Sequence, residues 1–223
     1  MNISTPTLSI LKSFTSINPS LYVNAGSVIK TISPQKTIIG RAEVDESFET
    51  SFGIYDLNQF ISTVSILDNP TFDFEDTSVH IKNGESSVRY GYADANMIMQ
   101  APEKDLDLPD VVVEFELKDS VFKKTMQAAS VMQLPNWAVV GANGDVTLVV
   151  GNSKDDSSNV FRHVVGSTDL EFDLLFKVEN LKFMSADYTV RISSKGISHF
   201  STNGGKLQYF IATESLLLKG FFY

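Results

Sequence analysis

The residues that could do acid–base or metal chemistry are few in this chain, and they lie far apart. The chain has no cysteine, which excludes thiol catalysis and disulfide bonds. Its three histidines, His80, His163 and His199, fall on segments predicted to be strands. A histidine in such a place is more often an ordinary strand residue than a general base or a metal ligand. The neighbouring carboxylates Asp155 and Asp156 lack the spacing of oxygen ligands that a calcium loop requires.

Motifs that bind nucleotides or build hydrolytic sites are also missing. The sequence contains no Walker A loop, no His-Glu-x-x-His and no Gly-x-Ser-x-Gly. We therefore predict no catalytic residue, no metal site and no cofactor. A hydrolase that uses Asp155 or Asp156 is kept as a third alternative, behind two non-enzymatic ones.

The lysines are more informative than the acids. Several lie at or beside the outward faces of predicted helices: Lys12, Lys118, Lys123, Lys124, Lys177 and Lys182. Acids gather instead in strands and loops, as in residues 43–49 and 103–110. The lysines could simply solvate these helix faces. Alternatively, they form one basic helical surface inside an acidic protein, which would attract phosphates without reading bases.

The elements that must position these lysines follow a repeated strand-into-helix pattern. Helices are predicted at residues 7–17, 56–67 and 118–132, and a further strand and helix at residues 171–183. In the second of these, Asp56 can cap the first turn. Its apolar residues share one stripe: Leu57, Phe60, Ile61 and Val64. The opposite stripe is polar but uncharged: Asn58, Gln59, Ser62, Thr63 and Ser65.

Length and composition indicate a folded α+β protein with two domains. The 223 residues are 43% hydrophobic and 20% charged, as in globular proteins. Residues 101–110 contain two prolines and four acids and lie near the midpoint, which is typical of a linker. We predict two similar domains, 1–105 and 106–223, each with a sheet and two helices. The sequence has no signal peptide and no membrane-spanning run, so we expect a cytosolic protein with no membrane partner.

Two segments of the first half carry a resemblance to a known family. Residues 11–18 read Leu-Lys-Ser-Phe-Thr-Ser-Ile-Asn, and residues 54–60 read Ile-Tyr-Asp-Leu-Asn-Gln-Phe. With the overall length, they resemble the sliding clamp, or DNA polymerase processivity factor, of T-even-like bacteriophages. The second half is similar more loosely, through residues 122–134 and 172–188.

The resemblance implies a DNA clamp fold that assembles into a homotrimeric ring. Helices would line the hole and face double-stranded DNA, and edge strands would join the copies. Such a ring tethers the replicative DNA polymerase in the cytoplasm of the infected host cell, and the family also allows a role in late transcription. Three copies at −9 each would carry −27, so we expect a clamp loader to place the ring on DNA. The uncharged face of the 56–67 helix departs from a uniformly basic lining.

The resemblance also implies a groove for the C-terminal peptide of the polymerase. By position, Ile39 and Gly40 of the first half and Phe210 and Ala212 of the last strand are expected near it. Packing in the core is the alternative for all four residues.

The end of the chain suggests a hypothesis of its own. Residues 216–223 read Leu-Leu-Leu-Lys-Gly-Phe-Phe-Tyr, which is similar to the aromatic peptides that clamps bind. This segment could dock in a clamp's own groove and compete with polymerase, in which case its deletion raises the affinity for the polymerase peptide. The alternative is a last strand with a packed end.

A monomeric, β-rich phage structural or assembly protein is the main alternative function. The mass in solution separates the two readings, because only the clamp is expected to be a trimer.

Overall fold

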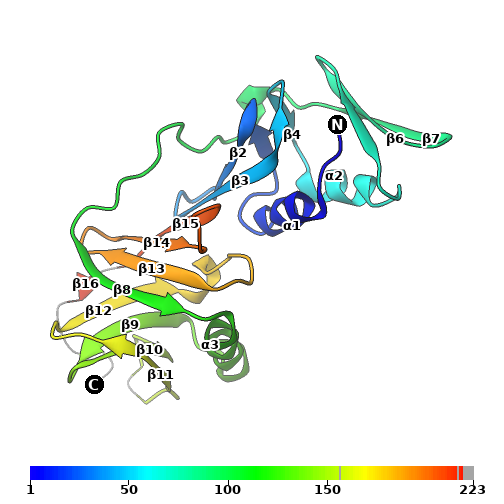
Figure 1. Cartoon of the computed structure of the whole chain (residues 1–223). Helices are drawn as coiled ribbons and strands as arrows, with labels where there is room; N and C mark the ends of the chain where they lie inside the picture. The colour runs from blue at the N-terminus through cyan, green and yellow to red at the C-terminus, as the bar shows by residue number, and fades with distance from the viewer. Residues whose placement is uncertain (156, 215, 218–223) are drawn as a thin grey trace. The chain divides into compact units, whose positions relative to one another are not determined.

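The computed structural model describes residues 1–155, 157–214 and 216–217 (Figure 1). The described chain forms two compact units. The first unit contains residues 1–104 and 182–184, and the second contains residues 105–181 and those from 185 onward. Both units combine antiparallel strands with helix, so the predicted α+β class is confirmed. The predicted domains, 1–105 and 106–223, stay a prediction about folding units.

The first unit has two helices and seven strands. The helices are α1 (Thr5–Phe14) and α2 (Leu57–Val64), and a 3-10 turn, η1 (Ala95–Met97), follows the last strand. The strands are β1 (Leu21–Val23), β2 (Gly26–Ile32), β3 (Ile38–Phe48), β4 (Phe52–Ile54), β5 (Thr71–Phe74), β6 (Ser78–Asn83) and β7 (Ser86–Gly91). Antiparallel pairing joins β2 to β3 and β1 to β4, while β5, β6 and β7 form a meander.

The core of the first unit lies where α1 packs on β3. Alternate residues of β3 are buried, among them Ile38, Gly40 and Ala42, as expected for a strand with one covered face. The Phe14 ring of α1 lies directly against Gly40, because a Cβ atom built there would come within 2.8 Å of the ring. Glycine at position 40 therefore sets how closely α1 approaches the sheet.

The second unit has one α-helix and nine strands within its described residues. The helix is α3 (Asp119–Met132), and a 3-10 turn, η2 (Val178–Asn180), follows β12. The strands are β8 (Val111–Leu117), β9 (Asn136–Ala142), β10 (Asp145–Gly151), β11 (Phe161–Ser167), β12 (Phe172–Lys177), β13 (Tyr188–Ser193), β14 (Ile197–Ser201), β15 (Leu207–Ala212) and β16 (Leu216–Leu217). One sheet runs β11-β10-β9-β12-β16, and β15-β14-β13-β8 are neighbours in the other.

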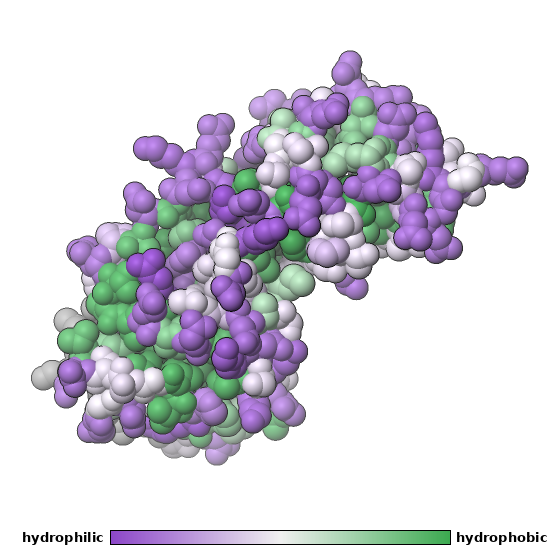
Figure 2. All heavy atoms as spheres, viewed as in Figure 1, coloured by the Kyte–Doolittle hydropathy of each residue, from purple (hydrophilic) through white to green (hydrophobic). Residues whose placement is uncertain are grey.

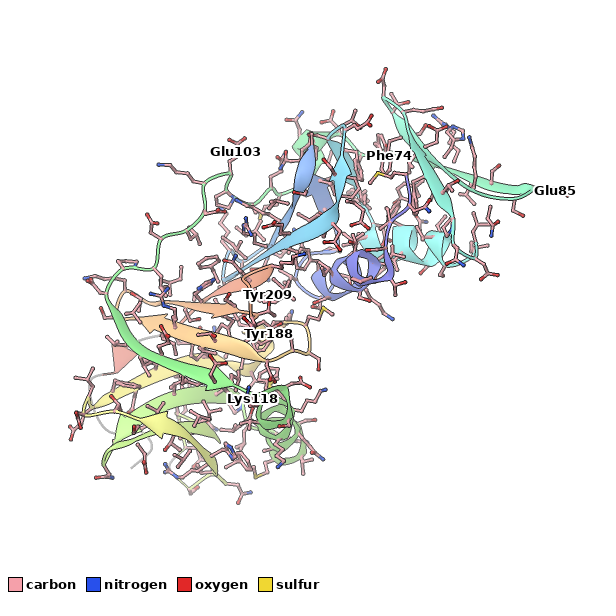
Figure 3. All side chains as sticks on the ribbon, viewed as in Figure 1. Phe74, Glu85, Glu103, Lys118, Tyr188 and Tyr209 are labelled. Atoms are coloured by element: carbon pink, nitrogen blue, oxygen red, sulfur yellow. The ribbon has the colours of Figure 1, made fainter. Side chains whose placement is uncertain are left out.

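Large aromatic residues fill the core of the second unit. Trp137, Tyr188 and Tyr209 are at most 1% exposed. Figure 3 shows the two tyrosines coming from β13 and β15. The indole Nε1 of Trp137 donates a 3.0 Å hydrogen bond to Oγ1 of Thr125, so α3 is tied to β9 through a buried polar contact.

The helix expected at the end of residues 171–183 is wrong. Strand β12 is present, but only the 3-10 turn η2 follows it. The backbone N–H of Val178 donates to the carbonyl of Pro135, and Leu181 is buried after a single turn. The spacing of Val178 and Leu181 fits a helix, yet the backbone bond to Pro135 uses the first donor of this segment in a contact with another element. Within its described residues, the second unit therefore has one α-helix where two were expected.

Candidate functional site

Helix α1 presents a mostly uncharged exposed face with a single lysine. Thr7, Leu11 and Phe14 are buried, while Thr5, Lys12 and Ser16 are exposed. The Ser4 side chain caps the first turn by accepting from the N–H of Thr7. The carboxylate of Glu46, on β3, accepts from the Ser4 N–H and from the Thr7 hydroxyl. Partial burial opposes ionisation of Glu46, but these hydrogen bonds outweigh it and lower its pKa.

Helix α2 is amphipathic but carries no charge on its outer face. Asp56 caps it by accepting a 2.9 Å hydrogen bond from the N–H of Gln59, as the sequence predicts. Leu57, Phe60 and Val64 are buried on the inner side. The exposed residues are amides and hydroxyls: Asn58, Gln59, Ser62 and Ser65.

Helix α3 begins in a network of ion pairs. Lys118 precedes the first turn (Figure 3), and its Nζ lies 3.0 Å from Oδ2 of Asp187. Oδ1 of Asp187 accepts a 2.8 Å hydrogen bond from the N–H of Asp119. Asp119 in turn pairs with Lys123 at 2.5 Å and accepts from the hydroxyl of Ser185. This network ties the loop before β13 to the start of α3.

The network shifts the ionisation of its members in the expected directions. The N–H of Asp119 lowers the pKa of Asp187, with Lys118 adding to the effect. A hydrogen bond from Lys123 lowers the pKa of Asp119, and Asp187 raises the pKa of Lys118. Lys118, Asp119 and Asp187 are therefore charged at neutral pH.

Sequence reasoning missed Asp187 and Ser185 in this network, since they lie 68 and 66 residues from Asp119. Residue 118 is the feature of the sequence that could have indicated this network. Lysine stands at the N-cap, where no side-chain cap is formed. A helix that starts with such a residue needs an acceptor from elsewhere in the fold.

Of the six lysines predicted to face DNA, only Lys12, Lys123 and Lys124 lie within helices. All three are exposed, and Figure 2 shows hydrophilic surface over α3. Lys177 ends β12 and pairs with Glu214 at 3.2 Å, while Lys182 is exposed in the segment after η2. The argument from helix faces therefore does not apply to Lys177 and Lys182, and their role stays a prediction.

The four residues expected at the peptide groove lie on β3 and β15. Ile39 is half-buried, and Gly40 packs against Phe14. Phe210 stacks on the His199 ring with a centroid distance of 4.6 Å, and Ala212 is half-buried at the end of β15. Their part in a groove stays a prediction.

A separate cavity of about 680 Å³ lies within the second unit. Leu134, Leu175 and Val178 contribute apolar surface to its wall. The ion pair between Lys177 and Glu214 lies at its edge. The carbonyl of the Asn136 side chain, also in the wall, accepts from the N–H and the hydroxyl of Ser153.

Among the described residues, the three histidines and Asp155 form no catalytic arrangement. The three histidines lie on β6, β11 and β14, as predicted. The carboxylate of Asp155 accepts from the N–H and hydroxyl of Ser157, so it closes a turn. Asp156 lies outside the described residues, as do residues 218–223 of the segment 216–223, so the hypothesis for that segment stays a prediction. Across residues 1–155, 157–214 and 216–217, no group of three or more acidic or histidine side chains could hold a metal ion.

No helix in the described part of the chain is long and apolar enough to cross a membrane.

Solved structures with this fold include sliding clamps of cellular organisms. The sliding clamp DnaN of Bartonella birtlesii matches with a TM-score of 0.72 and 12% identity, covering 96% of this chain and 64% of that one. PCNA of A. fulgidus, solved with the C-terminal region of FEN-1, matches with a TM-score of 0.68 and 15% identity, covering 93% and 94% of the two chains. The fold is therefore that of a sliding clamp.

Sequence comparisons define the family within this class. Residues 4–99 match the DNA polymerase processivity factor family, and residues 114–215 match the C-terminal part of the gp45 sliding clamp family. The sliding clamp of Vibrio phage KVP40 is 34% identical over 224 residues, covering 97% of this chain and 100% of that protein. The sliding clamp of Escherichia phage RB69 is 25% identical and covers 96% and 97%. The chain belongs to the phage sliding-clamp family and is a DNA polymerase processivity factor, which confirms the resemblance.

Proposed function

We propose that three copies of this chain close into a ring around duplex DNA and tether the replicative polymerase by its C-terminal peptide. The observation that carries the proposal is the match to the KVP40 clamp, which covers 97% of this chain and 100% of that protein. A clamp loader opens the ring, and the protein catalyses no reaction. Its place of work is the cytoplasm of the infected cell, and a role in late transcription stays a prediction.

Two sheet edges support ring assembly. Among the described residues, β7 ends the β5-β6-β7 meander and β11 ends the β11-β10-β9-β12-β16 sheet. An uncovered edge offers unpaired backbone groups to another chain. We propose that β7 of one copy pairs with β11 of the next, so that the closed ring leaves neither of these two edges unpaired.

The exposed helix faces support the contact with DNA. Lys12 and Lys124 lie among hydroxyl and amide side chains on α1 and α3. A few lysines among polar side chains attract DNA phosphates weakly and without regard to base sequence. A closed ring needs no tight contact, because topology prevents it from leaving the duplex.

The proposal is tested by retention on DNA of defined topology. Labelled protein is loaded onto nicked circular DNA by a compatible phage loader with ATP, freed of unbound protein by gel filtration, and then treated with a restriction enzyme. We expect the protein to stay on circles and to leave after linearisation, and light scattering to give the mass of a trimer. Equal retention on both forms, or a monomer at all concentrations, would reject the ring.

Absence of catalysis is tested separately. Nuclease and phosphatase substrates are incubated with the protein and added Mg²⁺, Mn²⁺ or Zn²⁺. We expect no turnover above that of buffer. Turnover that an Asp155→Asn variant loses would instead support the hydrolase alternative.

A further inference from the structure

We propose that only Lys12 and Lys124 supply electrostatic contact to DNA from the helices, and that Lys118 and Lys123 hold α3 in place instead. The inference rests on the proposed encirclement of DNA. The predicted basic surface is thereby divided into lysines that contact DNA and lysines that stabilise the protein. The surface that faces DNA then consists mainly of hydroxyl and amide side chains, with one available lysine on each of α1 and α3.

The first step is the charge balance at the start of α3. Lys118 pairs with Asp187, and Lys123 pairs with Asp119. Two cations and two anions sum to zero, so the group as a whole attracts distant phosphates little. Both carboxylates also accept further hydrogen bonds, from the N–H of Asp119 and the hydroxyl of Ser185. A phosphate that recruited Lys118 or Lys123 would have to break this arrangement.

The second step is the contrast with Lys124 and Lys12. Lys124 is the immediate neighbour of Lys123, yet it points from a different stripe of α3. Neither Lys124 nor Lys12 has an ion-pair partner among the residues that the structure describes. Both side chains are exposed. Their charge is therefore available to a phosphate at no cost in broken contacts.

The third step is the chemistry around these two lysines. On α3, Lys124 shares a stripe with Ser120 and Gln127, at spacings of four and three residues. On α1, Lys12 lies on the same stripe as Ser9, three residues before it, and Ser16 follows in the turn after the helix. Helix α2 adds a wholly uncharged face of amides and hydroxyls. The three helices thus share one kind of surface, in which cations are rare.

Such a surface suits sliding rather than holding. Each phosphate neutralised by a lysine adds up to about 0.9 to the slope of log affinity against log salt for B-form DNA. Hydroxyls and amides bond phosphates directly or through water and exchange these bonds quickly. Few cations therefore mean low friction and a weak dependence of movement on salt.

The experiment compares two adjacent lysines of one helix. Labelled clamps are loaded on stretched DNA with blocked ends, and their one-dimensional diffusion coefficient is measured by single-molecule tracking from low to moderate salt. We expect Lys124→Gln and Lys12→Gln to diffuse faster than the unmodified clamp at low salt and to respond less to added salt. The matched control Lys123→Gln should diffuse as the unmodified clamp does but unfold at a lower temperature.

The outcomes separate this inference from the proposed function. If Lys123→Gln or Lys118→Gln changes diffusion as much as Lys124→Gln, the division of the lysines is wrong, although the clamp still encircles DNA. Unchanged diffusion of the Lys12 and Lys124 variants overturns it as well. If the unmodified protein fails to stay between blocked ends, it is the proposed ring that fails.

Discussion

Trp137 is the largest fully buried side chain of the second unit, and its indole N–H needs an acceptor inside the core. The acceptor is the hydroxyl of Thr125, which is itself fully buried and donates to the carbonyl of Phe122. A buried donor without a partner loses the hydration that it has in the unfolded chain. This single hydroxyl therefore fixes both the rotamer of the indole and the position of α3.

We expect Thr125→Val to lower the free energy of unfolding by about 1–3 kcal/mol, because valine keeps the shape but removes the acceptor. Urea unfolding followed by fluorescence measures the change. In a Trp137→Phe background the same substitution should have a much smaller effect, since no N–H remains to be satisfied. An equal loss in both backgrounds would mean that the hydrogen bond is not the cause.

Gly40 offers a second test at the level of one atom. A Cβ at this position would lie 2.8 Å and 3.1 Å from two carbons of the Phe14 ring, which is fully buried. We expect Gly40→Ala to destabilise the protein by about 1–3 kcal/mol through overpacking. Phe14→Leu should relieve much of this loss in the double variant. If Gly40→Ala leaves stability unchanged but weakens binding of the polymerase peptide, residue 40 matters for the proposed peptide groove and not for packing against Phe14.

At the scale of elements, the first helix of each unit is capped by a distant carboxylate. Glu46 of β3 serves α1, and Asp187, just before β13, serves α3. The pKa of each carboxyl is lowered in the folded protein. A carboxyl with a lowered folded pKa stabilises the fold above its unfolded pKa and loses that contribution as the pH falls through the folded value. Acid should therefore loosen the starts of both helices.

We expect Glu46→Gln to flatten the loss of stability between about pH 6 and about pH 3, because one of the linked protonations disappears. Chemical unfolding at a series of pH values measures this slope. Glu43→Gln, an exposed change on the same strand, is the matched control for the loss of one charge. A slope that Glu43→Gln alters as much as Glu46→Gln would contradict the assignment.

Several elements could be predicted from sequence because their signals are local. Asp56 caps α2, and Asn143 and Gly144 form the two-residue turn between β9 and β10, with positive φ at both residues. The missing helix after β12 could not be predicted in this way. A backbone bond between Val178 and Pro135 decides it, and these residues are far apart in sequence. Local periodicity carries no information about such a bond.

At the scale of the whole molecule, the family could be predicted from residues 11–18 and 54–60, since the family matches confirm it. The division of the lysines could not. Lys123 and Lys124 are identical and adjacent in the sequence, and the ion pair of Lys123 with Asp119 distinguishes them in the folded protein. The sequence can therefore propose a basic surface but cannot say which of its charges are already compensated.

The edge strand β11 allows a test of how copies of the chain associate. Val164 on the edge strand β11 is 55% exposed, although it is β-branched and apolar. We expect Val164→Asp to prevent the proposed trimer from forming, because a carboxylate at a strand-to-strand contact must be desolvated. Sedimentation equilibrium measures the mass over a range of concentrations. Val164→Thr keeps the shape and should stay trimeric, whereas an unchanged trimer of Val164→Asp would exclude β11 as the joining edge.

The anchoring of the segment between the two units has a consequence for how this chain can vary. Nζ of Lys30 lies 2.7 Å from the carbonyl oxygen of Glu103 and 3.4 Å from that of Pro102, and Figure 3 shows Glu103 on the connecting segment. Both acceptors belong to the main chain, so these two hydrogen bonds do not depend on the side chains at positions 102 and 103. Substitutions at these two positions that keep the backbone path should therefore preserve both bonds.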